Sequence, residues 1–125
     1  MESLEIQATH DTPYVFCDAE NAELTMTGRS LPENPLRIYE QIFKWADAFD
    51  KDTVKLNFKL EYFNTASSKQ IFTLIRTFIE NKNVVNVSVK WHYEEGDYDS
   101  KETGEHFSHL FKIPFDFIEY AESGF

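Results

Sequence analysis

A cluster of hydroxyl and amide side chains, Phe63-Asn64-Thr65-Ala66-Ser67-Ser68-Lys69, is the part of this sequence best suited to chemistry. It lies where a predicted strand ends and an amphipathic helix begins, which in an α/β sheet is where binding crevices form. Asn64 or Thr65 can accept hydrogen bonds from the free N–H groups of the helix start and so cap it. One capping residue is enough for that role, whereas the segment holds three hydroxyls and an amide.

Phosphorylation is the chemistry that this location favours. A phosphate at a helix N-terminus gains from the free N–H groups and from the positive end of the helix dipole. It adds roughly −1.5 to −2 charges at neutral pH, and Lys69, four residues after Thr65, is placed to partner it. Two interpretations of the segment therefore stand: a structural helix cap, and a phosphorylation switch that changes a docking surface.

His106 and His109 form a second candidate group, because imidazoles three residues apart on a helix, preceded by carboxylates, can bind a divalent ion. The pair lacks the glutamate of a zincin HExxH motif, and Asp97-Tyr98-Asp99 lacks the glycine and the final glutamate of an EF-hand loop. We therefore expect exposed polar residues and no specific metal site. A metal-dependent hydrolase or metal sensor using His106 and His109 stays open as an alternative function.

Nucleotide-binding and nucleophile motifs are absent from the sequence. The four glycines stand at 28, 96, 104 and 124, so no GxGxxG or GxxxxGK[ST] loop can form, and there is no GxSxG elbow. Cys17 is the only cysteine and sits in an apolar run, which is typical of a buried, inert thiol and excludes an internal disulfide. We expect no catalytic residue and no cofactor.

The charge balance excludes further functions. The chain has 12 Lys and Arg against 22 Asp and Glu, a formal net charge of −10, which argues against binding to nucleic acid or to an anionic membrane surface. The N-terminus lacks the pattern of a signal peptide, and no stretch approaches the apolar length of a membrane span. Together with the single cysteine, these features predict a cytoplasmic protein.

The negative charge is concentrated in the last third of the chain. Nine acidic and two basic residues from 92 to 125 give that segment a formal charge of −7, against −3 for the first 91 residues. We interpret the segment as a solvated acidic rim that serves solubility or steers a basic partner. On this view a phosphate on Thr65 is a large local change, provided that the acidic segment does not fold back beside it.

Alternating and helical apolar patterns predict the elements that must position these residues. Asn34 and Pro35 mark the start of the first helix, as its N-cap and first residue. After Pro114, we expect a final helical turn or two over 115–121. The remaining predicted elements are strands at 4–9, 14–18, 23–27, 53–62 and 85–94 and helices that end near 49, run from about 65 to 81, and span 104–112.

The resulting order, β-β-β-α-β-α-β-α, indicates the fold class. Strands joined through helices should run parallel with right-handed crossovers, whereas the short turns between the first three strands predict antiparallel hairpins. Because the strands alternate apolar and polar residues, one face of the sheet must be polar. We therefore predict one α/β domain over 1–125, a two-layer mixed β-sheet with helices on one face and a STAS-like order of elements.

Four stretches of the sequence resemble the SiaC family of regulatory phosphoproteins. Two of them are the more specific, the Pro-Glu-Asn turn at 32–34 and the Tyr-Phe-Asn-Thr-x-Ser-Ser-Lys run at 62–69. Ala66 stands where the family often has serine and Leu31 where it often has an aromatic residue, which leaves the threonine and the turn intact. In order along the chain, the stretches are 8–13, 28–34 with Tyr39 and Trp45, 60–69, and 89–95 with 104–107.

The resemblance implies a non-catalytic signalling protein that is reversibly phosphorylated on Thr65. In such systems a dedicated serine/threonine kinase adds the phosphate and a PP2C-type phosphatase removes it. The unphosphorylated form binds an effector, a diguanylate cyclase in one branch, which implies a role in cyclic di-GMP signalling and biofilm control. The residues that we expect to bind the partner or support the phosphate are Asn64, Ser67, Ser68, Lys69, Glu33 and Asn34.

A STAS-type anti-sigma-factor antagonist is a further alternative. Those proteins are also small mixed α/β domains with a phosphorylated hydroxyl at a helix start. The likeness is one of architecture, and a shared fold does not fix a partner. The sequence thus predicts a phosphorylation-gated interaction protein, with the metal-dependent protein and the STAS-like antagonist as alternatives.

Overall fold

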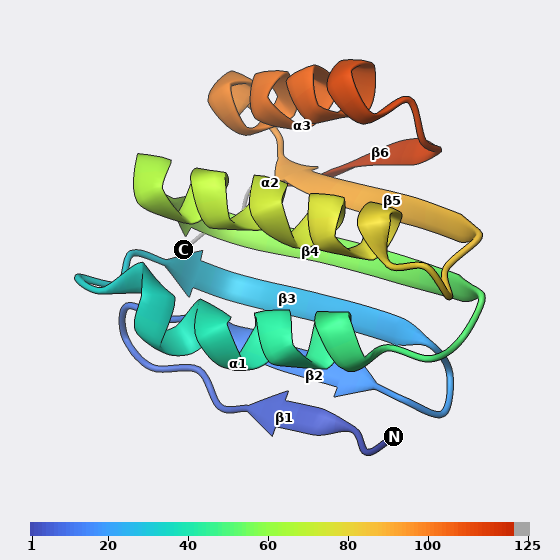
Figure 1. Cartoon of the computed structure of the whole chain (residues 1–125). Coiled ribbons are helices and arrows are strands. Elements are labelled where there is room, and N and C mark those ends of the chain that lie inside the picture. The colour runs from blue at the N-terminus through green and yellow to red at the C-terminus, as the bar shows by residue number, and fades with distance from the viewer. Residues whose placement is uncertain (122–125) are drawn as a thin grey trace.

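Six strands and three helices make up residues 1–121, the part of the chain that this computed structural model describes (Figure 1). In chain order they are β1 (Leu4–Ile6), β2 (Tyr14–Asp18), β3 (Glu23–Ser30), α1 (Pro35–Ala48), β4 (Thr53–Phe63), α2 (Thr65–Glu80), β5 (Asn86–Glu94), α3 (Tyr98–Phe111) and β6 (Phe115–Tyr120).

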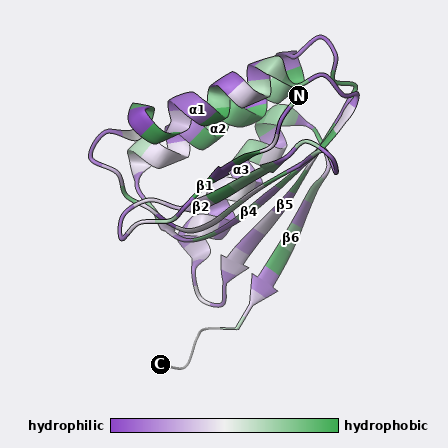
Figure 2. Ribbon diagram, turned by 90° about the horizontal axis from the view of Figure 1, so that it is seen from below, coloured by the Kyte–Doolittle hydropathy of each residue, from purple (hydrophilic) through white to green (hydrophobic). Residues whose placement is uncertain are grey.

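The sheet keeps its strands in chain order, from β1 at one edge to β6 at the other. The first three strands pair antiparallel, whereas β3 with β4, β4 with β5 and β5 with β6 pair parallel. A helix joins the two strands of each parallel pair, and crossovers of one hand place successive helices on the same face. Figure 2 shows α1, α2 and α3 together on one side of the sheet. The predicted two-layer mixed α/β fold is confirmed.

Alternation along each strand decides which side chains enter the core between the sheet and the helices. In β4, Lys55 and Lys59 are exposed on the open face, and every second residue is buried beneath the helices. In β5, the buried ring of Trp91 lies 5.7 Å from Phe58 and 5.8 Å from Phe107 of α3, between ring centroids. The buried β4 residues are Val54, Leu56, Phe58 and Leu60.

The direction of the helices matters for function. A helix that follows a strand and leads to the next parallel strand must begin at the carboxyl end of the first strand. Consequently α1, α2 and α3 all begin at the same edge of the sheet (Figure 1). Aromatic contacts hold α1 against α2, with the ring of Phe78 in α2 5.6 Å from Phe49 and 6.2 Å from Trp45.

The prediction of a final helical turn or two over 115–121 is wrong, because β6 occupies residues 115 to 120. Phe115 pairs with Val89 and Phe117 with Trp91, so both phenylalanines face the core side of the sheet. A short alternating run that follows a helix is ambiguous by pattern alone. Residues 115–120 form a strand because the unpaired edge of β5 offers hydrogen-bond partners to their backbone N–H and C=O groups.

The predicted start of one helix and the predicted end of one strand also differ from the structure. The third helix begins at Tyr98 rather than Gly104, because its first turn has no buried apolar side chain and so lacks the apolar pattern that marks a helix. The third strand does not end at Gly28. Instead Gly28 adopts a φ of 101°, a bulge follows it, and the strand continues to Ser30.

Candidate functional site

Thr65 is the first residue of α2 and is exposed at the carboxyl edge of the sheet. Asn64 caps the helix: its side-chain oxygen accepts a hydrogen bond from the Ser67 N–H at 2.8 Å, and its carbonyl accepts one from the Ser68 N–H at 2.9 Å. Of the two capping candidates, the structure selects Asn64 and leaves the Thr65 hydroxyl outside the cap. The first turn of α2 contains no acidic residue, so no carboxylate there offsets the positive end of the helix dipole.

A buried hydroxyl network lies beneath Thr65 and ties α2 to the strand end beside it. The Ser67 hydroxyl donates to the Ser30 carbonyl at 2.8 Å and lies 2.7 Å from the Ser30 hydroxyl, which is 2.9 Å from the hydroxyl of Tyr39. Burial raises the pKa of Tyr39. Ser67 is 0% exposed, so its side chain lies in the core and not on the surface around Thr65.

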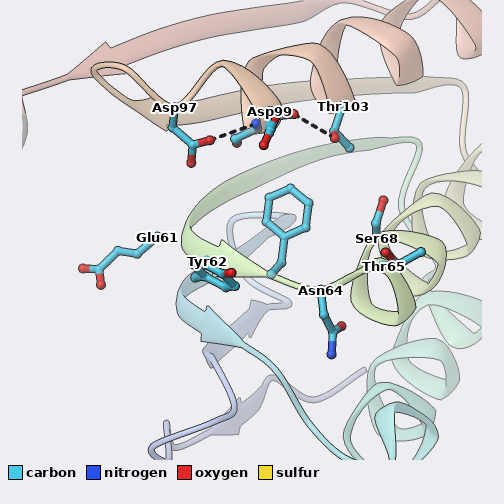
Figure 3. Close-up of a pocket in the computed structure, with 10 residues that line it drawn as sticks. Glu61, Tyr62, Asn64, Thr65, Ser68, Asp97, Asp99 and Thr103 are labelled. Carbon is cyan, nitrogen blue, oxygen red and sulfur yellow. Dashed lines mark hydrogen bonds between the residues drawn. The ribbon is translucent and has the colours of Figure 1, made fainter.

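A pocket with a volume of about 290 Å³ opens beside Thr65 (Figure 3). Its walls come from the end of β4, the start of α2 and the first turns of α3. Three of the lining residues are acidic, and the lining contains no lysine, arginine or histidine. The lining residues are Glu61, Tyr62, Phe63, Asn64, Thr65, Ser68, Asp97, Asp99, Ser100 and Thr103.

The acidic segment does fold back beside Thr65. Asp97 and Asp99 belong to the segment that starts at residue 92, and they line the same pocket as Thr65. The condition attached to a large local change, that this segment does not fold back beside Thr65, is therefore not met by its first acidic residues. The physical reason is the crossover after β5, which starts α3 at the same sheet edge as α2. Glu122, which also belongs to this segment, lies outside the described residues.

The start of α3 is held by a cap and by the core. The Asp97 carboxylate accepts a hydrogen bond from the Ser100 N–H at 3.1 Å, the usual arrangement of an N-cap aspartate. The indole N–H of Trp91 donates to the Ser100 carbonyl at 3.0 Å. Aspartate is a favoured N-cap residue, so Asp97 is the signal in the sequence that points to a helix start at this wall of the pocket.

The other predicted site residues divide into two groups. Ser68 lines the pocket together with Asn64 and Thr65. Lys69, Glu33 and Asn34 are exposed but are not part of the lining. Asn34 is the N-cap residue of α1, as predicted, although its side chain makes no capping hydrogen bond. Both Glu33 and Asn34 follow the end of β3. The carbonyl of Ser30, the last residue of β3, accepts the Asn64 N–H at 3.2 Å, so the chain leaves β3 at the same edge of the sheet at which α2 begins.

Sequence reasoning missed most of the residues that complete the pocket. Glu61 and Tyr62 looked like ordinary strand residues, and Asp99, Ser100 and Thr103 lay before the predicted start of the third helix. No local pattern joins residue 61 to residue 99. Their meeting depends on the parallel pairing of β4 with β5.

The structure also shows the surroundings of the histidine pair and of the single cysteine. His106 and His109 are exposed on α3, and within residues 1–121 no three or more His, Cys, Asp or Glu side chains gather where they could hold a metal ion. Cys17 is 0% exposed, and burial raises the pKa of its thiol to about 12, which keeps it protonated at neutral pH. In the described part of the chain, every helix is too short or too polar to cross a membrane.

Known proteins are similar to this chain in sequence and in architecture. A family model for SiaC family regulatory phosphoproteins matches residues 6–120. An uncharacterized protein from Pseudomonas aeruginosa strain UCBPP-PA14 is 30% identical over 119 residues, which cover 92% of this chain and 94% of that protein.

Solved structures agree with the sequence comparison. The crystal structure of apo-SiaC from Pseudomonas aeruginosa superposes with a TM-score of 0.79 at 29% identity, covering 94% of this chain and 99% of that chain. A chain in the crystal structure of the diguanylate cyclase SiaD in complex with its activator SiaC, from the same organism, gives a TM-score of 0.81 at 28% identity. That match also covers 94% of this chain and 99% of the other.

Proposed function

The chain belongs to the SiaC family of regulatory phosphoproteins, and from this membership we propose a non-catalytic signalling protein whose binding to an effector is gated by a phosphate on Thr65. A dedicated serine/threonine kinase adds the phosphate and a PP2C-type phosphatase removes it. The unphosphorylated form binds the effector. A diguanylate cyclase is the first candidate, because SiaC of Pseudomonas aeruginosa is an activator of the cyclase SiaD.

The observation that carries this proposal is the position of Thr65, exposed at the first residue of a helix that another residue caps. Because Asn64 supplies the cap, a phosphate on Thr65 removes no hydrogen bond from the helix start. The free N–H groups and the helix dipole favour the added negative charge. The fold can therefore accept a phosphate on Thr65 without losing this cap. The expected change is then in the surface around Thr65.

The surface around Thr65 has the features of a binding surface. Tyr62, which precedes it at the end of β4, is 59% exposed, and the guanidinium carbon of Arg29 lies 5.9 Å from the centre of its ring. Tyrosine and arginine, together with tryptophan, are the side chains that most often contribute the binding energy of protein interfaces. A phosphate beside them adds charge and bulk, raises the cost of desolvating the surface, and repels acidic groups of a partner.

Intact-mass measurement after co-expression with the cognate kinase tests the modification. We expect one added phosphoryl group on the wild-type protein and none on Thr65→Ala. Ser68→Ala is the matched control, since Ser68 is the other hydroxyl at this helix start that lines the pocket, and it should still take up the phosphate. Uptake by Thr65→Ala would show that the site is wrong.

Binding to the effector is tested separately with pull-downs that use Thr65→Ala and Thr65→Glu as baits. We expect Thr65→Ala to retain a diguanylate cyclase and Thr65→Glu to lose it. Equal retention by both baits would contradict gating at this residue. Recovery of an ATPase from a sigma-factor system, with no cyclase, would instead favour the STAS-like alternative.

A further inference from the structure

We propose that the first turn of α3 senses the phosphate on Thr65, because the added charge repels Asp97 and Asp99 across their shared pocket and loosens the cap that Asp97 provides. This inference rests on the proposed function and describes how the same site is regulated. According to this inference, the stability of the first turn of α3 differs between the phosphorylated and the unphosphorylated protein.

Two helix starts face one pocket, with α2 capped by Asn64 on one side and α3 capped by Asp97 on the other. In Figure 3, Asp97 and Asp99 lie along one wall of the pocket, with Thr65 and Ser68 on another. A phosphate attached to the Thr65 oxygen therefore enters or borders a space that already holds carboxylates.

The charge of the pocket opposes an added phosphate. Glu61, Asp97 and Asp99 are acidic, and the lining has no lysine, arginine or histidine. Lys69, the cation predicted to partner the phosphate, is exposed and lies outside the lining. The ion pairs found within residues 1–121 involve other residues, namely Met1 with Asp50 and Lys44 with Glu40. Screening by salt is incomplete below a Debye length of about 8 Å at physiological ionic strength, so groups that line one small pocket repel each other.

The two helices respond differently to the phosphate. The first turn of α2 has no acidic residue, so a phosphate at Thr65 complements its dipole and stabilises it. The start of α3 has the same positive end, but the Asp97 carboxylate, which accepts the Ser100 N–H, and Asp99 in the first turn already offset it. The same phosphate thus protects the start of α2 and weakens the start of α3.

The effect stays local, because the core holds the rest of α3. The Trp91 indole N–H donates to the Ser100 carbonyl, and Gly104 packs so closely on the indole that a β-carbon there would lie 2.8 Å from three of its atoms. Phe107 also contacts Trp91, with the ring centres 5.8 Å apart. These contacts confine the loosening to residues up to about position 101.

Amide hydrogen exchange followed by NMR tests the inference. The sample is full-length protein with phosphothreonine installed at position 65 by genetic-code expansion, which needs no kinase. Relative to the unmodified protein, we expect about fivefold faster exchange at the Ser100 and Lys101 amides, the change that the loss of one N-cap produces. Exchange at the Ser68 amide should slow or stay constant. Unchanged exchange at Ser100 and Lys101 would overturn the inference.

Charge-neutral variants identify the cause. The pair Asp97→Asn and Asp99→Asn removes both charges while asparagine still caps the helix, so phosphorylation should no longer accelerate exchange in α3. The pair Glu102→Gln and Glu105→Gln is the matched control, since both glutamates are exposed on α3 and neither lines the pocket. A full response in the aspartate variant would contradict the repulsion.

The two proposals can fail separately. If the cognate kinase does not modify Thr65, the proposed function fails, whatever the installed phosphothreonine does to α3. If installed phosphothreonine leaves α3 unchanged while the kinase still modifies Thr65 and binding is still gated, only the present inference fails.

Discussion

Ser30 and Ser67, 37 residues apart in the chain, make two contacts in the core: the Ser67 hydroxyl donates to the Ser30 carbonyl, and their hydroxyl oxygens lie 2.7 Å apart. Because each hydroxyl has one proton, Ser30 must then donate to Ser67, and Tyr39 must donate to Ser30 at 2.9 Å. Every buried proton in the network has an acceptor, which is the condition for burying hydroxyls without a net loss. The switch segment is thereby joined to β3 and α1.

Removal of the Ser67 hydroxyl should destabilise the protein. Ser67→Ala leaves the buried Ser30 hydroxyl without its acceptor, so we expect the free energy of unfolding to fall by about 1 to 3 kcal/mol. Ser68→Ala, at the next position, removes a hydroxyl that lines the pocket and should change it by less than about 0.5 kcal/mol. Urea denaturation of both variants measures the difference. Equal stabilities would argue against the network.

The cap on α2 should also be measurable. Asn64→Ala removes the acceptor of the Ser67 N–H, so we expect a loss of about 1 kcal/mol in the free energy of unfolding. Asn34→Ala is the matched control, because Asn34 is the N-cap residue of α1 but makes no side-chain capping bond. Thermal denaturation of the two variants tests this, and a larger loss for Asn34→Ala would contradict it.

Gly104 should resist replacement by alanine. In an open helix, the change from glycine to alanine stabilises by about 1 kcal/mol, but here the new β-carbon would lie 2.8 Å from the Trp91 indole. We therefore expect the opposite sign, a loss of about 1 to 3 kcal/mol from overpacking. Denaturation followed by tryptophan fluorescence measures it. The neighbouring exposed Glu105→Ala serves as control, and a stabilised Gly104→Ala would show that α3 is free to move away from Trp91.

The buried thiol of Cys17 should make stability fall at alkaline pH. Burial raises its pKa from 9.0 to about 12, so above about pH 9 the unfolded chain loses a proton that the folded protein keeps. The folded state then binds more protons, and the free energy of unfolding decreases as pH rises. We expect wild type to lose about 1 kcal/mol more than Cys17→Ala between pH 8.5 and 10. Parallel curves for the two proteins in urea titrations would contradict this.

Local patterns in the sequence were sufficient for most of the fold. The alternation of β4, the apolar stripes of α1 and α2, and the polar start at Asn64 and Thr65 are periodic or nearest-neighbour signals that depend on few residues. They placed Thr65 at a helix start, next to a strand end, without any knowledge of tertiary contacts. Where the local signal was weak, as in the polar first turn of α3 and the short β6, the prediction failed.

The tertiary structure alone decided what surrounds Thr65. The pocket joins residues 61–68 to residues 97–103, and the buried network joins Ser67 to Ser30. Such contacts depend on which strands pair and on which side each crossover packs, and those are properties of the whole chain. The sequence by itself therefore determined that Thr65 begins a helix. Only the folding of β5 and α3 beside it determined that a phosphate there would face Asp97 and Asp99, because parallel crossovers start consecutive helices at one edge of the sheet.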